Sequence, residues 1–176
     1  VSGSASPMTA RQIEWAGNNN FDCIRIPAGD LAEPGAAERT QKQLVEQGLK
    51  SFAAGNSVLL YSASGPNDPS IQTTRERLAA ATGRSTARVL GTAMGRMTRE
   101  LLERTGLRRV VIAGGDTSSY ATQELQLYGL EMSAQLTPGA PLCRAYSEAP
   151  HFDGLEIALK GGQMGKEDYF GMVRGR

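Results

Sequence analysis

A short run of β-branched residues followed by two glycines does most to limit the folds open to this chain. Residues 110–112 are Val-Val-Ile, which predicts a strand buried on both faces. Gly114 and Gly115 follow, then an acid and three hydroxyls at 116–119, and residues 120–128 can form a helix. Such a turn presents backbone N–H groups at the positive end of the helix dipole, a place that binds phosphates. The other interpretation is an ordinary strand–turn–helix joint with a Ser/Thr cap.

The composition is that of one soluble globular domain covering residues 1–176. Hydrophobic residues make up 40% and charged residues 21% of the chain. Nineteen basic and 18 acidic side chains leave a net charge of +1, which argues against a nucleic-acid partner. No apolar stretch is long enough to cross a bilayer, so we expect no membrane partner. Cys23 and Cys143 lie far apart without metal-ligand spacing, which favours reduced thiols in a cytoplasmic protein.

The beginning of the chain combines small residues with a helix start. Residues 1–4 resemble the end of a strand, so we expect further polypeptide before them in the natural gene product. Thr9 and Gln12 have the spacing of a capping box, which places the helix start at Thr9 and leaves the preceding serines free. A competing start has Ser6 as the cap and Pro7 as the first helical residue.

Strands and helices alternate through the first two thirds of the chain. Residues 21–26 and 57–62 are predicted strands, while residues 38–54 and 71–81 are predicted helices. Ser85 can cap a longer helix that ends near Thr105, with methionines that we interpret as core residues. This alternation predicts an α/β fold with a mainly parallel sheet flanked by helices on both faces.

The last third predicts additional antiparallel strands. Residues 130–136 and 141–146 form two of them around a Pro-Gly turn, and residues 155–159 form another. The last of these runs into Lys160 and a glycine-rich segment, before a short helix at 169–173. Ligands of such sheets bind at the carboxyl ends of the strands. We therefore expect the serine-rich entry, the glycines near 114 and those near 162 to converge on one edge.

The sequence lacks the two common nucleotide-binding motifs but has one carboxylate in a position to bind a metal ion. Neither the P-loop pattern nor the Gly-x-Gly-x-x-Gly pattern occurs, and His151 is interpreted as a loop residue. Asp116, next to the two glycines, can hold Mg²⁺ beside phosphates, because that ion prefers oxygen ligands. The alternative is that Asp116 only favours the helix dipole.

Three segments carry a family resemblance. These are Val-Ser-Gly-Ser-Ala-Ser-Pro-Met-Thr-Ala-Arg-Gln-Ile at 1–13, Gly-Gly-Asp-Thr-Ser at 114–118 and Leu-Lys-Gly-Gly-Gln-Met-Gly-Lys-Glu-Asp-Tyr-Phe at 159–170. In this order the set resembles the C-terminal nucleotide-binding domain of the four-carbon acid sugar kinases. The chain departs from the usual family pattern at Ala5 and at Gln163-Met164, which bears on the identity of the sugar acid.

The resemblance implies that ATP and Mg²⁺ are the cofactors. It also implies phosphorylation of the terminal hydroxyl of a 3-oxo-tetronate, threonate or similar acid. The catalytic base would lie in an N-terminal sugar-binding domain of the same polypeptide, so this domain alone would be inactive. A homodimer is compatible with the sequence. The implied nucleotide-binding residues are Ser4, Ser6, Gly114, Gly115, Asp116, Thr117, Ser118, Lys160, Gly161, Gly162 and Gly165, with Asp116 also the proposed Mg²⁺ ligand.

Two other functions remain open from the sequence. One is a phosphosugar-binding or isomerase domain, because hydroxyl-rich turns at helix starts also hold sugar phosphates. The other is a nucleotide-binding module without catalytic chemistry.

Overall fold

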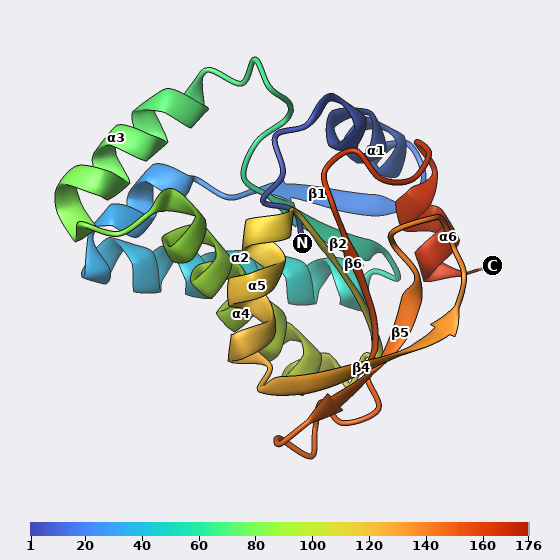
Figure 1. The fold of residues 1–176 in the computed structure, drawn as a ribbon. Coiled ribbons are helices and arrows are strands. Elements are labelled where there is room, and N and C mark those ends of the chain that lie inside the picture. The colour runs from blue at the N-terminus through green and yellow to red at the C-terminus, as the bar shows by residue number, and fades with distance from the viewer. Residues whose placement is uncertain (176) are drawn as a thin grey trace.

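A computed structural model describes residues 1–175, which form an α/β fold (Figure 1). The helices and strands are, in chain order, α1 (Pro7–Gly17), β1 (Phe21–Arg25), the 3-10 helix η1 (Ala28–Ala32), α2 (Pro34–Ala53), β2 (Ser57–Tyr61), α3 (Ser70–Thr82), α4 (Thr86–Thr105), β3 (Arg109–Ala113), α5 (Gly115–Glu124), β4 (Leu127–Ala134), β5 (Leu142–Ser147), β6 (Glu156–Lys160) and α6 (Tyr169–Arg174).

The strands form two groups that a single residue connects. β1 pairs with β2 in parallel, and the second group has the order β3-β6-β5-β4. β3 and β6 are parallel, whereas β5 is antiparallel to both β6 and β4. Ser2 forms parallel bridges to β2 on one side and to β3 on the other. The predicted fold class is therefore confirmed, including the antiparallel strands of the last third.

Ser2 joins the two groups through its backbone. Its N–H donates to the carbonyl of Leu60 at 2.8 Å, and its own carbonyl accepts from the N–H of Ser62 at 3.1 Å. On the other side, the Gly3 N–H donates to the carbonyl of Ala113 at 2.9 Å. The first residues are thus the end of a central strand, and Figure 1 shows the amino terminus inside the fold.

Helices cover both faces of the sheet. Buried residues of α2 and α4 pack against Ile26 and Leu60, while α1 and α6 pack against Leu59 and Ala113. Neighbouring residues of β2 thus belong to different cores, as alternation in a strand requires. Figure 1 shows α2, α4 and α5 on one side of the sheet and α1 and α6 on the other. A third cluster lies between α5, Phe152 and the strands β3, β5 and β6.

Several predicted bounds need correction. The helix expected at 120–128 begins at Gly115 and ends at Glu124, because Gly114 adopts a φ of 116° and the chain enters the helix directly. The positive φ of Gln126 then turns the chain, so that β4 starts at Leu127, before the predicted residue 130. The predicted cap Ser85 is confirmed, since its side chain accepts from the N–H of Arg88.

The strand around 110–112 is less buried than its sequence predicts. Ile112 is fully buried, but Val110 and Val111 are only partly buried. The reason is a groove beside the amino-terminal half of β3. Both valines line this groove. Full burial on both faces was therefore the wrong expectation for this half of the strand.

The structure shows no helix among residues 1–175 that is long and apolar enough to cross a membrane. Both cysteines are free thiols. Burial raises the pKa of Cys23 to about 11, so this thiol is a poor nucleophile at neutral pH.

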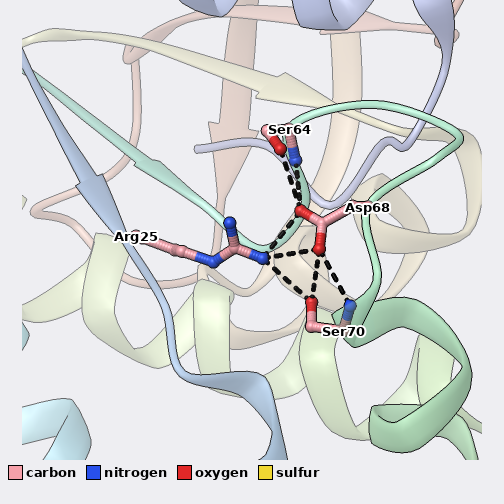
Figure 2. A network of polar contacts seen from close by, with 4 residues as sticks. All are labelled: Arg25, Ser64, Asp68 and Ser70. Carbon is pink, nitrogen blue, oxygen red and sulfur yellow. Dashed lines mark hydrogen bonds and ion pairs between the residues drawn. The ribbon is translucent and has the colours of Figure 1, made fainter.

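A buried carboxylate fixes the loop between β2 and α3. Asp68 accepts from the N–H and hydroxyl of Ser64 at 2.8 and 3.0 Å, and from those of Ser70 at 3.0 and 2.8 Å. The guanidinium of Arg25 donates to both of its oxygens at 2.7 Å (Figure 2). Burial opposes ionisation, but these hydrogen bonds outweigh it and hold the pKa of Asp68 well below its usual range. The network thereby ties the start of α3 to β1.

We expect Asp68→Asn to lower the free energy of unfolding by about 2–3 kcal/mol, because an amide cannot accept all of these hydrogen bonds. The stabilisation by the native carboxylate is full above the pKa of an unfolded aspartate, about 3.9, and is lost as the pH falls further. Urea denaturation at pH 7 and pH 3 measures both effects. The matched control is Glu38→Gln on the exposed face of α2, which should change stability little. Equal stability of the two variants at pH 7 would contradict this role.

Candidate functional site

Three small-residue corners meet at one edge of the sheet. The first follows Ser2, the second follows β3 at Gly114, and the third follows β6 at Gly161. These three strands are parallel neighbours, so their carboxyl ends lie side by side. The convergence expected from the sequence therefore occurs in the structure.

The first and second corners approach so closely that side chains would not fit between them. A β-carbon on Gly3 would lie 2.0 Å from the hydroxyl oxygen of Thr117. A β-carbon on Gly114 would lie 3.3 Å from the backbone nitrogen of Ser4. Glycine is thus required at Gly3 by contact, and at Gly114 by both contact and a positive φ.

The first and third corners are joined by hydrogen bonds. The carbonyl of Gly162 accepts from the hydroxyls of Ser6 and Thr9, the latter at 2.9 Å. A β-carbon on Gly162 would lie 2.6 Å from the hydroxyl oxygen of Ser4. The Gly114 N–H, in turn, donates to the carbonyl of Lys160 at 2.9 Å. All three corners therefore form one connected unit.

The capping box predicted at Thr9 is wrong, and the competing start is confirmed. Ser6 is the N-cap of α1, because its hydroxyl accepts from the Thr9 N–H at 3.1 Å while Pro7 fixes the first turn. Thr9 is thereby free to donate to Gly162, and Ser6 is not free, contrary to the expectation. The Gln12 side chain instead donates to the carbonyls of Met164 and Lys166, and so fastens the glycine-rich loop to α1.

A cleft of about 320 Å³ opens where the corners meet. Six of the predicted residues line it, and five lie behind its wall. Those on the lining are Ser4, Gly114, Gly115, Asp116, Thr117 and Gly162. Those that do not line it are Ser6, Ser118, Lys160, Gly161 and Gly165.

The residues behind the wall support it. The Ser118 hydroxyl donates to the carbonyl of Gly114 at 2.7 Å, within the first turn of α5. Gly165 adopts a φ of 81°, and a β-carbon there would lie 2.7 Å from the ring of Tyr169. Gly161 accepts from the Met164 N–H in a turn of the same loop.

The amino terminus of α5 faces the cleft without a side-chain cap. Gly114 occupies the N-cap position and forms no side-chain hydrogen bond. Gly115 and Asp116, the next two residues, are exposed, and a β-carbon on Gly115 would meet nothing within 4 Å. The first N–H groups of a helix lack intrahelical partners, so α5 offers uncapped donors to an anion.

Lys160 places a buried amino group beneath the cleft. It is 1% exposed, and its Nζ lies 3.2 Å from the Thr9 hydroxyl and 3.4 Å from the Gly162 carbonyl. Burial lowers the pKa of Lys160 to about 8. Within residues 1–175 no carboxylate forms a salt bridge with it. A buried cation without a counter-ion is costly, and an anion in the adjoining cleft would stabilise it.

Asp116 is the one carboxylate on the lining of the cleft, and residues 1–175 contain no cluster of three metal-binding side chains. An all-protein metal cage therefore does not fit this site. Mg²⁺ bound by one carboxylate, waters and substrate phosphates does fit, because that ion keeps much of its hydration in proteins.

The opposite wall was missed by sequence reasoning. It consists of Arg75 from α3 with Thr86, Ala87 and Leu90 from the first turns of α4. The Arg75 guanidinium is exposed and forms no salt bridge in the described part of the chain. The Ser85 cap marked the start of α4 in the sequence, but nothing in the sequence indicated which surface this helix faces.

Two glycines of α4 bring that wall close to α5. A β-carbon on Gly91 would lie 2.7 Å from that of Tyr120, and one on Gly95 would lie 2.8 Å from the α-carbon of Ala121. Small residues at this spacing allow the two helices to pack tightly against each other. Their four-residue separation in the sequence is a signal that helical periodicity could have revealed.

A parallel α/β sheet whose glycine corners surround an uncapped helix terminus defines a class of anion-binding domains. Residues 1–170 match the family model described as a nucleotide-binding C-terminal domain. The chain belongs to this family, which confirms the resemblance to the C-terminal domain of the four-carbon acid sugar kinases.

Curated relatives of this chain are named as kinases. One, from Paraburkholderia graminis, is named 3-oxo-isoapionate kinase and is 44% identical over 99% of this chain. Another, from Pseudomonas savastanoi, is named 3-oxo-tetronate kinase and is 36% identical over 97% of this chain. The matches span 37% and 36% of those proteins, so the chain corresponds to little more than a third of each.

The fold also resembles that of a solved structure. A Haemophilus influenzae protein superimposes with a TM-score of 0.79 and 23% sequence identity. The match covers 99% of this chain and 39% of that protein. At this level of identity the likeness shows a shared fold.

We expect Gly162→Ala to destabilise the protein by about 1–3 kcal/mol, since its methyl group would overlap the Ser4 hydroxyl. The matched substitution Gly115→Ala enters open space at a non-positive φ and should leave stability unchanged or slightly raised. Thermal denaturation of the two variants beside the parent distinguishes them. If Gly162→Ala is as stable as Gly115→Ala, the two corners are not in the contact described.

Proposed function

We propose that this chain is the ATP-binding part of a kinase that phosphorylates the terminal hydroxyl of a 3-oxo sugar acid. The observation that carries the proposal is the buried Lys160 amino group, without a carboxylate partner among residues 1–175, beneath a cleft that an uncapped helix terminus also faces. Both features favour a polyanionic ligand. Membership of the family and the kinase names of the relatives supply the reaction class.

Each part of the cleft has a role in this proposal. The phosphates lie at the first turn of α5, where the N–H groups of Gly115, Asp116 and Thr117 donate to their oxygens. The Ser4 hydroxyl and the charge of Lys160 act from the opposite side. Such fixed donors suit phosphoryl transfer, which depends mainly on positioning and on charge stabilisation. Mg²⁺, which would neutralise phosphate charge, would be held by Asp116 together with phosphate oxygens.

The remaining wall suits the rest of a nucleotide. Ala87 and Leu90 give an apolar surface for the base, and Arg75, which forms no salt bridge within residues 1–175, is a second cation for the phosphates. Ser6, Ser118, Gly161 and Gly165 then act indirectly, by holding the corners in place. In this proposal, fewer than the eleven implied residues contact the nucleotide directly.

In this proposal, the binding site for the sugar acid and the catalytic base lie outside this chain. The chain spans little more than a third of its relatives, so we propose that an N-terminal domain of the same polypeptide binds the sugar acid and supplies the base. The relative named 3-oxo-isoapionate kinase makes that acid the first substrate to test, followed by 3-oxo-tetronates and threonate. The homodimer and the cytoplasmic location stay predictions.

Calorimetric titration of the chain with ATP-Mg²⁺, ADP and a panel of sugar phosphates tests the proposal. We expect nucleotide binding that strengthens with Mg²⁺, and no binding of the sugar phosphates. Binding of a sugar phosphate without nucleotide binding would instead establish the phosphosugar or isomerase function. Joining the chain to its upstream domain and measuring ATP consumption with each sugar acid distinguishes a kinase from a nucleotide-binding module.

We expect Gly115→Ile to weaken nucleotide binding at least about tenfold, because the side chain would occupy the space that a phosphate needs beside the helix terminus. Gly115→Ala, with a smaller group in the same place, should have a smaller effect. Circular dichroism checks that both variants fold, since a β-carbon there meets no protein atom. Unchanged affinity of the folded isoleucine variant would place the nucleotide elsewhere.

The low pKa of Lys160, about 8 in the free protein, predicts that nucleotide binding takes up a proton. A bound phosphate favours the charged amine and raises its pKa, so affinity should fall as the pH rises above 8, by up to about tenfold per pH unit. Calorimetry in buffers of different ionisation enthalpy measures the proton. Lys160→Met should remove the uptake, whereas Lys166→Met, at an exposed position, should retain it. Equal uptake by both variants would exclude Lys160.

A further inference from the structure

The sheet contains a second cavity, separated from the cleft by Val1 and Ser2, where its middle strand stops. A groove of about 230 Å³ separates the amino-terminal halves of β2 and β3. It is lined by residues of both strands and by side chains from helices on both faces of the sheet. Among them are Val58, Val110 and Val111 from the strands, Leu101 from α4 and Phe170 from α6. Val1 closes its upper end.

The walls of the groove carry unused strand edges. Along β2, Leu60 bonds to Ser2, and alternation directs the Leu60 N–H and the Val58 carbonyl toward the groove. Along β3, Ala113 bonds to the first residues, and the same alternation directs the Val111 N–H and the Arg109 carbonyl toward the groove. Both edges therefore point donors and acceptors into the gap between them.

The amino group of Val1 already begins to fill these positions. It donates to the carbonyl of Val111 at 2.7 Å, as the backbone N–H of a central strand would. Burial lowers the pKa of this amino group to about 5, so the groove disfavours a charged terminus. An amide N–H at the same place would form the same hydrogen bond without a buried charge.

The register fixes the length of the missing partner. Ser2 bridges Tyr61 and Ala113, the last residues of two strands that each have five residues. Val1 and Ser2 supply two of the five positions opposite each strand. Three further residues, directly before Val1, would therefore extend the ladder to Ser57 and Arg109, where both strands begin.

We propose that this groove is the seat of a strand that runs directly into Val1, parallel to β2 and β3. Its three residues are apolar, since helices cover both faces of the sheet at this point. The residue before Val1 bonds to Leu60 and Val58, and the one before that bonds to Val111 and Arg109. The sheet then becomes continuous along the full length of its six strands and the inserted one.

Continuity with Val1 favours this occupant over a second copy of the chain. A strand from another molecule would have to end against the Val1 amino group, which closes the groove. The relatives are also nearly three times as long as this chain, so polypeptide to form such a strand exists in proteins of this family. The strand thereby becomes part of the link between the two halves of the kinase.

The test compares the chain as it is with versions extended by three residues, each released from a cleavable tag. We expect Ile-Val-Ile before Val1 to raise the urea midpoint and to slow amide exchange of Leu60 and Val111 at least about tenfold. The matched extension Ile-Pro-Ile keeps the apolar contacts but removes the N–H that faces Arg109. Because its carbonyls can still accept from the Leu60 and Val111 amides, it should raise the urea midpoint less than Ile-Val-Ile does, and Ser-Gly-Ser should raise it least.

Three results would overturn the proposal. The first is unchanged exchange at both amides with Ile-Val-Ile. The second is an equal urea midpoint for Ile-Pro-Ile and Ile-Val-Ile, which would mean apolar contact without a ladder. The third is a dimer of the unextended chain in sedimentation that persists with Ile-Val-Ile, since the groove would then hold a second copy and not the extension. None of these measurements involves nucleotide, so their outcome is independent of the proposed kinase function.

Discussion

The backbone of Ser2 is the constraint on which the rest of the structure depends. Its hydrogen bonds to Leu60 and Ser62 on one side, and those of its neighbours to Ala113 on the other, make one sheet of two strand groups. Because the chain leaves this position at the carboxyl edge, residues 3–6 enter the space between the corners after β3 and β6. Ser2 and its neighbours thereby join the two strand groups through backbone hydrogen bonds, and the core cluster of Leu59 and Ala113 joins them through side chains.

The cleft combines close approach with unpaired positive charge. Glycines at 3 and 162 let backbones meet where β-carbons would collide, and Gly114 adds a tight approach at a positive φ. Beneath it, Lys160 is buried among hydroxyls and carbonyls, with no carboxylate partner in the described chain. The dipole of α5 points its positive end to the same place. Positive charge gathered in this way raises the free energy of the empty domain, and a bound polyanion would lower it. The electrostatics therefore agree with the description of the family as nucleotide-binding.

The cleft and the groove have opposite characters. The cleft lies at the carboxyl edge, where loops give polar groups and glycines, and it suits a soluble anion. The groove lies within the sheet, between apolar helices and open strand edges, and it suits polypeptide. Ser2 and Val1 separate them, so a strand inserted in the groove would lead straight into the first corner of the cleft. The link to an upstream domain and the nucleotide site would then share one strand.

Local patterns in the sequence determined the element order, the α/β class and the three corners, since strand runs, glycines and caps act over a few residues. The family resemblance carried by those patterns implied Ser4, Gly114–Thr117 and Gly162, which line the cleft. Tertiary structure alone decided that Thr9 reaches Gly162 and that Lys160 is buried against Thr9, because these contacts join residues more than 150 positions apart in the chain. It also brought Arg75 and the start of α4 opposite the corners, through the packing of Gly91 and Gly95 on α5. Which residues are neighbours across a sheet edge is set by strand order and helix packing, and neither is encoded in a local pattern.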